Sequence, residues 1–136
     1  MATFNKFNVL TASLANGLHN LASDQITVAL SSTLPTAGMA NLAALTGAIA
    51  YTNLSSRNVT TTSSTQTGGV YSLVLADLVL TASGAVPTFR YVVLYNSTAV
   101  GGELIGWYDY GSNVTMANLE TFTIDFTDAQ TLFDIT

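Results

Sequence analysis

The sequence predicts a mainly β protein, an antiparallel β-sandwich or barrel with one N-terminal α-helix and a second short helix. Three observations predict it. Several short segments alternate apolar with polar residues, clusters of turn residues separate them, and the spacing of an amphipathic helix is clearest near the start of the chain. At 136 residues the chain is long enough for one real core, and we expect a single domain over residues 1–136.

The first two elements follow from residues 4–31. Apolar residues recur at three- and four-residue steps from Phe4 to Leu21, which predicts a helix that ends near Asn20 because Gly17 weakens its last turn. Residues 25–31 then predict a strand by their strict alternation. Its expected core side chains are Ile26, Val28 and Leu30, and those expected to face solvent are Thr27 and Ala29.

The middle of the chain is less regular. Asn41 is a suitable cap for a second short helix up to Ala50, with Leu42, Leu45 and Ile49 on one side. Residues 53–69 are rich in Ser, Thr and Asn, and we expect an exposed region there with a strand at 59–62.

Three further segments of the C-terminal half predict strands. Residues 71–80 predict one continuous strand, and residues 132–135 predict a short last one. Residues 121–127 alternate most clearly, and the side chains expected to face inward are Phe122, Ile124 and Phe126.

The stretch from Thr88 to Gly111 predicts a hairpin that is apolar on both faces. In its first strand Phe89, Tyr91, Val93 and Tyr95 are expected on one face, and Val92 and Leu94 on the other. In its second strand Leu104, Tyr108 and Tyr110 oppose Ile105 and Trp107. A hairpin with one solvated face would alternate apolar with polar residues. We therefore expect its second face to be covered by the rest of the domain or by another protein.

The low charge of the chain points to assembly. Charged residues make up 8 % of it, against about 25 % in an ordinary soluble protein. Ser, Thr and Asn replace them, and such a surface costs less to desolvate than one covered in Lys and Glu. Lys6, Arg57 and Arg90 are too few for a phosphate-binding surface, so we expect neither a nucleic-acid nor a membrane partner. No secretory signal is evident, which predicts synthesis in the cytoplasm.

The sequence offers little for catalysis. His19 is the single histidine, and a place at the end of the first helix is the favoured explanation for it. Asp125 and Asp128 lack the ligand spacing of a calcium loop, and there is no cysteine. Glu103 and Asp109 could each approach Arg90, either as a structural salt bridge, which we favour, or as an interface ion pair. We expect no catalytic residue, no cofactor and no metal site.

The aromatic residues of the hairpin are the candidate interface. That set comprises Phe89, Arg90, Tyr91, Tyr95, Trp107, Tyr108 and Tyr110. Aromatic residues of this kind form contact hot spots or sugar-stacking platforms, and ordinary core pairs are the simpler alternative. Because one small core cannot hold all of them, we expect some to be exposed, with protein contact favoured over carbohydrate.

Several segments, in order, resemble small virion proteins encoded in the structural gene modules of tailed bacteriophages. They are FNKFN, HNLASDQITVALSST, YSLVLAD, LTASG, FRYVVLYNSTA, LIGWYDYG and ETFTIDF. Leu119 departs from this pattern, because a turn glycine is expected there. The resemblance implies a non-enzymatic capsid decoration (cement) protein on the outer head. It also implies the major capsid protein and other virion subunits as partners, and a homo-oligomer, either trimer or dimer. The alternative is a neck, tail or fibre-base component with a host-glycan contact; an enzyme or metal-binding module is the least favoured.

Overall fold

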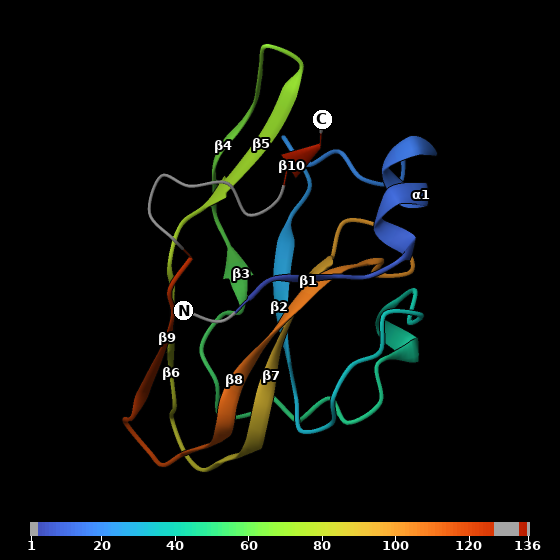
Figure 1. Ribbon diagram of the computed structural model, residues 1–136. Coiled ribbons are helices and arrows are strands. Elements are labelled where there is room, and N and C mark those ends of the chain that lie inside the picture. The colour runs from blue at the N-terminus through green and yellow to red at the C-terminus, as the bar shows by residue number, and fades with distance from the viewer. Residues whose placement is uncertain (1–2, 127–133, 136) are drawn as a thin grey trace.

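The computed structural model describes residues 3–126 and 134–135, and it confirms a mainly β fold with antiparallel sheets and one α-helix. Figure 1 shows the arrangement of the elements along the chain. In order these are β1 (Asn5–Lys6), α1 (Val9–Ala15), β2 (Ile26–Ser31), the 3-10 helix η1 (Leu42–Ala44), β3 (Asn58–Val59), β4 (Thr61–Thr67), β5 (Val70–Leu75), β6 (Leu78–Thr81), β7 (Val86–Asn96), β8 (Leu104–Met116), β9 (Thr121–Ile124) and β10 (Asp134–Ile135).

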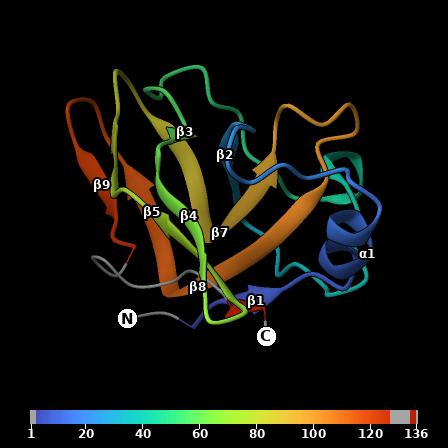
Figure 2. The same cartoon turned by 90° about the horizontal axis from the view of Figure 1, so that it is seen from above.

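The strands form one large sheet and two small ones. The large sheet has the order β1-β8-β7-β2-β3, and the small ones are β10-β5-β4 and β6-β9. Seen from above, the small sheets lie on one side of the large sheet, with α1 away from them on the other (Figure 2). The result is sandwich-like, and the predicted fold class is confirmed.

Two apolar clusters lie on opposite faces of the large sheet. The larger cluster joins β2, β7 and β8 to the small sheets, and its fully buried members include Ile26, Val28, Leu30, Leu73, Leu80, Phe89, Leu94 and Ile105. The smaller cluster consists of Phe7, Ala29, Leu45, Val93, Tyr95 and Leu104. Both faces of β7 from Tyr91 to Asn96 are therefore covered from within this chain, whereas β8 is partly exposed from Trp107 to Thr115.

Because both faces of the large sheet are covered, the predicted solvent-facing side of β2 is wrong. All six residues of β2 are buried, including Thr27 and Ala29, which the alternation placed in solvent. Ala29 belongs to the smaller cluster, and the Thr27 hydroxyl bonds to Ser97 Oγ at 2.8 Å. The alternation of β2 thus separates two buried faces rather than an inside from an outside.

Bulges correct two assignments within the hairpin. Ile105 is an extra residue in β8, because Leu94 is opposite Gly106 while Tyr95 is opposite Leu104. Leu104 therefore shares the smaller cluster with the half-buried Trp107, although the alternation placed them on opposite faces. Irregular pairing on both sides of Phe89 likewise places its ring in the larger cluster, with Val92 and Leu94.

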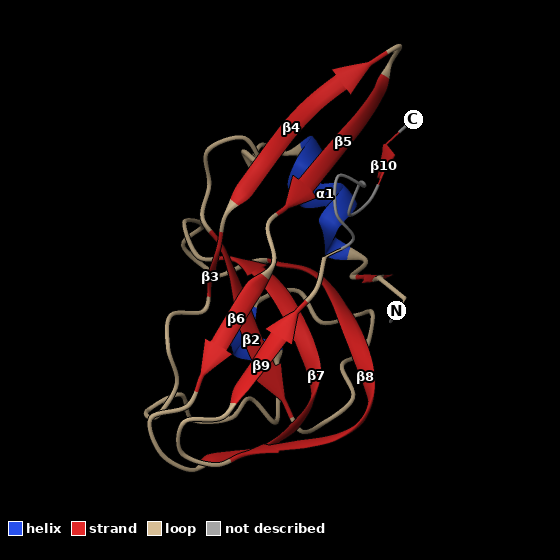
Figure 3. Ribbon diagram, turned by 90° about the vertical axis from the view of Figure 1, so that its left-hand side faces the viewer, coloured by secondary structure: helices blue, strands red, loops and turns tan. Residues whose placement is uncertain are grey.

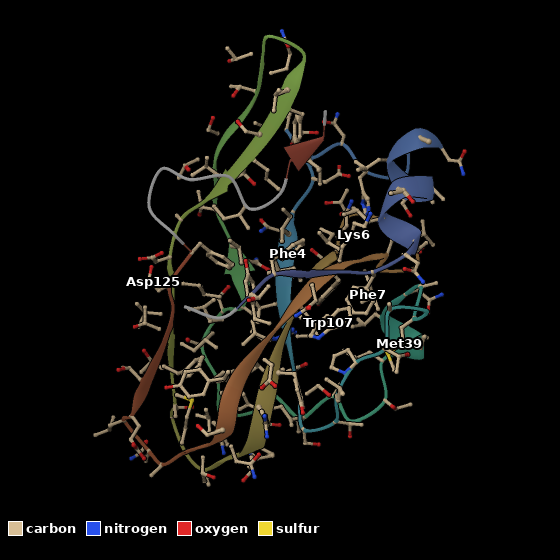
Figure 4. All side chains as sticks on the ribbon, in the orientation of Figure 1. Phe4, Lys6, Phe7, Met39, Trp107 and Asp125 are labelled. Atoms are coloured by element: carbon tan, nitrogen blue, oxygen red, sulfur yellow. The ribbon has the colours of Figure 1, made fainter. Side chains whose placement is uncertain are left out.

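The N-terminal helix is shorter than predicted. It spans only Val9–Ala15, and Gly17 follows it with a left-handed backbone (φ +76°). The residues before it are extended, and Asn5 pairs with Trp107 in β8. Phe7 then lies against the Trp107 ring, with 4.6 Å between ring centroids (Figure 4). The apolar residues that begin at Phe4 therefore cover the large sheet as well as forming one side of a helix.

The middle of the chain differs from the prediction in detail. The Asn41 side chain does cap the second helix, accepting from the Ala44 amide at 3.1 Å, but only the 3-10 turn η1 follows it. The strand predicted at 59–62 is two, β3 and β4, and β4 pairs with β5 in a hairpin.

The strand predictions for the C-terminal half are largely confirmed, except for residues 71–80. The strand predicted over 71–80 breaks between β5 and β6, because these two pair with different partners. In and just after β9, Ile124 and Phe126 are buried and Phe122 is half-buried, as predicted. Asp134–Ile135 forms β10, whereas Leu132 and Phe133 lie outside the described residues. Leu119, where a glycine was expected, has φ +72°.

Removing the Phe7 ring tests the cover of the second face. Phe7 is fully buried, so Phe7→Ala should lower the free energy of unfolding by about 3–5 kcal/mol in urea denaturation. Val100→Ala is the matched control, since the Val100 side chain is fully exposed and its loss should change stability by less than about 0.5 kcal/mol. Equal small effects from both variants would contradict the assigned cover.

Candidate functional site

The structure divides the predicted interface set into buried and accessible residues. Phe89, Tyr91 and Tyr95 are at most 9 % exposed and belong to the core. Arg90, Trp107 and Tyr108 are half-buried, and Tyr110 is 54 % exposed. Three of the seven residues therefore cannot reach a partner in this fold, and Tyr110 is the most accessible of the rest.

Two of the accessible aromatic residues line a groove between β8 and β9, whereas Trp107 lies outside it. Tyr108 and Tyr110 project from β8, while Phe122 projects from β9. The remaining lining residues are Val92, Thr123, Ile124 and Asp125. We name this site the aromatic groove, and its volume is about 320 Å³. Figure 3 shows β8 and β9 on the same side of the molecule, and Figure 4 places Asp125 at the end of β9, far from Trp107.

Ring contacts fix the shape of the aromatic groove. The Tyr110 and Phe122 rings meet edge-on with 5.1 Å between centroids. The centroid of the Tyr108 ring lies 5.7 Å from that of Phe4 and 6.3 Å from that of Phe126. These two rings hold Tyr108 against the larger cluster. Such packing gives rigid ring faces at little cost in side-chain entropy, which suits them to recognition.

The polar groups of the aromatic groove are few. Burial raises the pKa of the Tyr108 hydroxyl, which is therefore protonated at neutral pH and can donate a hydrogen bond. Asp125 and Thr123 are exposed and supply acceptors at the rim. This combination of ring faces, a few hydroxyls and one carboxylate can bind a partner. It offers no activated nucleophile beside a base among the lining residues.

Sequence reasoning identified two of the seven residues that line this groove. Tyr108 and Tyr110 were predicted as interface residues, whereas Phe122 and Asp125 were treated as an ordinary inward and outward pair of a strand. The missing signal is tertiary, because nothing in the alternation of residues 121–127 shows that β9 lies beside β8.

Arg90 and Asp109 form the predicted salt bridge across β7 and β8. Arg90 Nε and Nη2 donate to the two carboxylate oxygens of Asp109 at 2.8 and 3.1 Å. Its hydrogen bonds from Arg90 and from the Gly111 amide hold the pKa of Asp109 below its usual value. Both side chains are over a third exposed, so the pair contributes little to stability. Glu103 does not join it; its backbone pairs with that of Asn41 instead.

His19 lies in a buried polar network, not at a helix end as predicted. Its Nδ1 is 2.9 Å from Asn96 Nδ2, which also donates to Asp24 at 2.7 Å. Asn96 Oδ1 accepts from the backbone amides of Thr98 and Ala99, which fixes the orientation of this amide. Asn96 Nδ2 is therefore the donor, so His19 Nδ1 is unprotonated and Nε2 carries the hydrogen.

This network connects two loops. It ties the segment before β2 to the turn after β7, because Asn96 ends β7 and Asp24 also accepts from the Asn20 amide. His19 is 7 % exposed, and its Nε2 has no hydrogen-bond partner within the described residues. A shallow hollow beside it is lined by Leu14, Gly17, His19, Asn20, Leu21, Ala22, Ser64 and Tyr71.

Neither a metal-binding cluster nor a membrane-spanning helix occurs in the described ranges, 3–126 and 134–135. They contain no group of three or more His, Cys, Asp and Glu residues placed to hold a metal ion. No helix within them is long and apolar enough to cross a membrane.

Comparisons with known proteins leave the family open. No protein-family model matches the chain, and neither a curated protein nor a solved structure shows significant similarity to it.

The His19 network predicts that acid destabilises the protein. Burial lowers the pKa of His19 from 6.5, while Asp24 and Glu103 partly oppose the shift. The unfolded chain then binds a proton at a higher pH than the folded one. Stability is therefore complete above about pH 6.5 and falls below it, by at most about 1.4 kcal/mol per pH unit. Urea unfolding between pH 5 and 7 measures this slope.

His19→Gln is the control for this dependence. His19 is the only histidine of the chain, so its removal should flatten the stability profile between about pH 5 and 6.5. A wild-type profile that rises on acidification would contradict the buried neutral imidazole, as would an unchanged slope in the variant.

Proposed function

We propose that this protein is a non-enzymatic structural component of a tailed-phage virion, and that it serves as a decoration protein on the outer capsid. The proposal rests on the resemblance of its segments, from FNKFN to ETFTIDF, to small virion proteins. It places the protein on the capsid surface after synthesis in the host cytoplasm, with the major capsid protein as its main partner.

The aromatic groove supports this proposal by offering a surface suited to contact with another protein. Tyr110 exposes 54 % of its surface beside Phe122, on a chain with 8 % charged residues. Rigid aromatic rings with little charge around them are typical of protein contacts, because they lose little hydration when covered. We assign the groove to the contact with the shell, in place of the buried hairpin residues.

Many identical copies strengthen such a contact. A groove of about 320 Å³ gives each copy only a modest anchor. A decoration protein is, however, held by several neighbours at once, and linked weak contacts become strong together. This mode of binding agrees with a low-charge surface that associates without long-range attraction.

A charge in the groove tests the shell contact. Tyr110→Glu should abolish binding to undecorated capsids while the free energy of unfolding changes by less than about 1 kcal/mol, since Tyr110 is mostly exposed. Val100→Glu adds the same charge at a fully exposed turn residue and should leave binding intact. Co-sedimentation with capsids measures binding, and circular dichroism checks the fold.

Counting copies tests the placement in the particle. Quantitative mass spectrometry of purified virions should find this chain in numbers comparable with those of the major capsid protein. A count that matches a single ring of subunits would overturn the decoration role.

Full capsid binding by Tyr110→Glu would instead reject the groove as the contact with the shell.

The aromatic groove also favours one alternative, a neck, tail or fibre-base component that contacts a host glycan. Exposed tyrosine faces beside a carboxylate, here Asp125, suit a sugar ring and its hydroxyls. Binding to a glycan array that Tyr110→Ala abolishes, together with a low copy number per virion, would support this alternative over decoration.

A further inference from the structure

A projecting hairpin arm is the most exposed part of the fold. β4 and β5 extend beyond the large sheet in two perpendicular views (Figures 1 and 3). From Thr65 to Val70 every residue is exposed, around a two-residue turn at Gly68 and Gly69. Both glycines have positive φ, which is the geometry of a type I′ turn. We name residues 61–75 the hairpin arm.

Within the described residues, the outer edge of the hairpin arm has no partner strand. In the three-stranded sheet β5 lies between β10 and β4, and no other described strand pairs with β4. A two-residue turn makes Thr67 and Val70 a hydrogen-bonded pair, and such pairs alternate along an antiparallel ladder. The backbone N–H and C=O groups of Ser64 and Gln66 therefore point away from β5, toward the open edge.

This edge lacks most of the usual protection against pairing. Proteins block exposed edges with charged residues, proline or bulges. Between Arg57 and Asp77 the sequence contains neither charge nor proline. The single irregularity in the pairing of β4 with β5 lies at its base, between Thr61 and Ser63, so the strand is regular from Ser63 to Thr67.

We propose that β4 pairs with β4 of a second copy of this chain, antiparallel, to form a two-fold dimer. Ser64 of one copy would then lie opposite Gln66 of the other, and each would offer the outward groups that its partner needs. The shared sheet would run continuously through both arms. The dimer does not depend on the virion role, and it assigns a specific contact to the homo-oligomer that the resemblance implies.

The regular register of the edge favours a second copy as the occupant, and the uncharged arm limits the charge repulsion that opposes it. The chain carries a net charge of −5, so two copies repel each other over most approaches. The hairpin arm is uncharged and projects from the body, which lets two edges meet while the acidic residues stay apart. Pairing of uncharged Thr, Ser and Gln strands by main-chain hydrogen bonds requires no complementary charge.

A proline at an outward position tests this pairing. Gln66→Pro removes an N–H that faces away from β5, so the hairpin itself can form, but the edge loses a donor and gains a ring. Gln66→Ala is the matched control, because both variants lose the bond from the Gly69 amide to Gln66 Oε1. Sedimentation velocity over a micromolar to millimolar series measures the dissociation constant.

We expect the wild type and Gln66→Ala to dimerise alike, and Gln66→Pro to weaken the dimer by at least about tenfold. A wild type that stays monomeric throughout the series would overturn the proposal, and so would a dimer that Gln66→Pro does not weaken.

Amide hydrogen exchange gives a second measurement that needs no variant. The amides of Ser64 and Gln66 should gain protection as the wild-type concentration rises. The amides of Thr65 and Thr67, already bonded to β5, should change little. Unchanged exchange at Ser64 and Gln66 in a dimer would assign the contact to another surface and reject this one.

Discussion

The fold depends on one constraint, which is that the central strands of the large sheet are apolar on both faces. β2 and β7 place buried side chains alternately into two clusters, so neither face can be left to water. The small sheets cover one face. Phe7, Leu45 and their neighbours cover the other, which explains why the chain before α1 is extended against β8 instead of helical. Both covering layers keep apolar side chains of the large sheet away from water.

This internal cover changes where a partner can bind. If another protein covered the second face, Tyr95 and its neighbours would be the contact surface; instead they are core residues. Two surfaces of the described residues remain candidates for partners: the aromatic groove, built on Tyr110 and Phe122, and the open edge of the hairpin arm. The first offers side chains and the second offers backbone, so the two can serve different partners at once. Low charge suits both, because each contact must shed water from a polar but weakly charged surface.

Local pattern predicted the parts of the fold that local physics decides. The alternation around Phe122 and Ile124, the cap at Asn41 and the salt bridge of Arg90 with Asp109 were all predicted, because each involves neighbours along a strand, a turn or a hairpin. The errors arise where distant segments decide. One extra residue, Ile105, reverses the faces of β8, and no count of apolar residues reveals a bulge. Likewise, the strand predicted over 71–80 is broken because β5 and β6 pair with different strands, which the local pattern does not show.

Native-state hydrogen exchange on the monomer shows whether the chain covers its own sheet. At concentrations where sedimentation shows a single chain, the β7 amides between Tyr91 and Tyr95 should exchange only through global unfolding, with a free energy equal to that from urea denaturation. Rapid exchange in the isolated chain, with protection gained only on assembly, would contradict this internal cover. The second face of the hairpin would then belong to a partner.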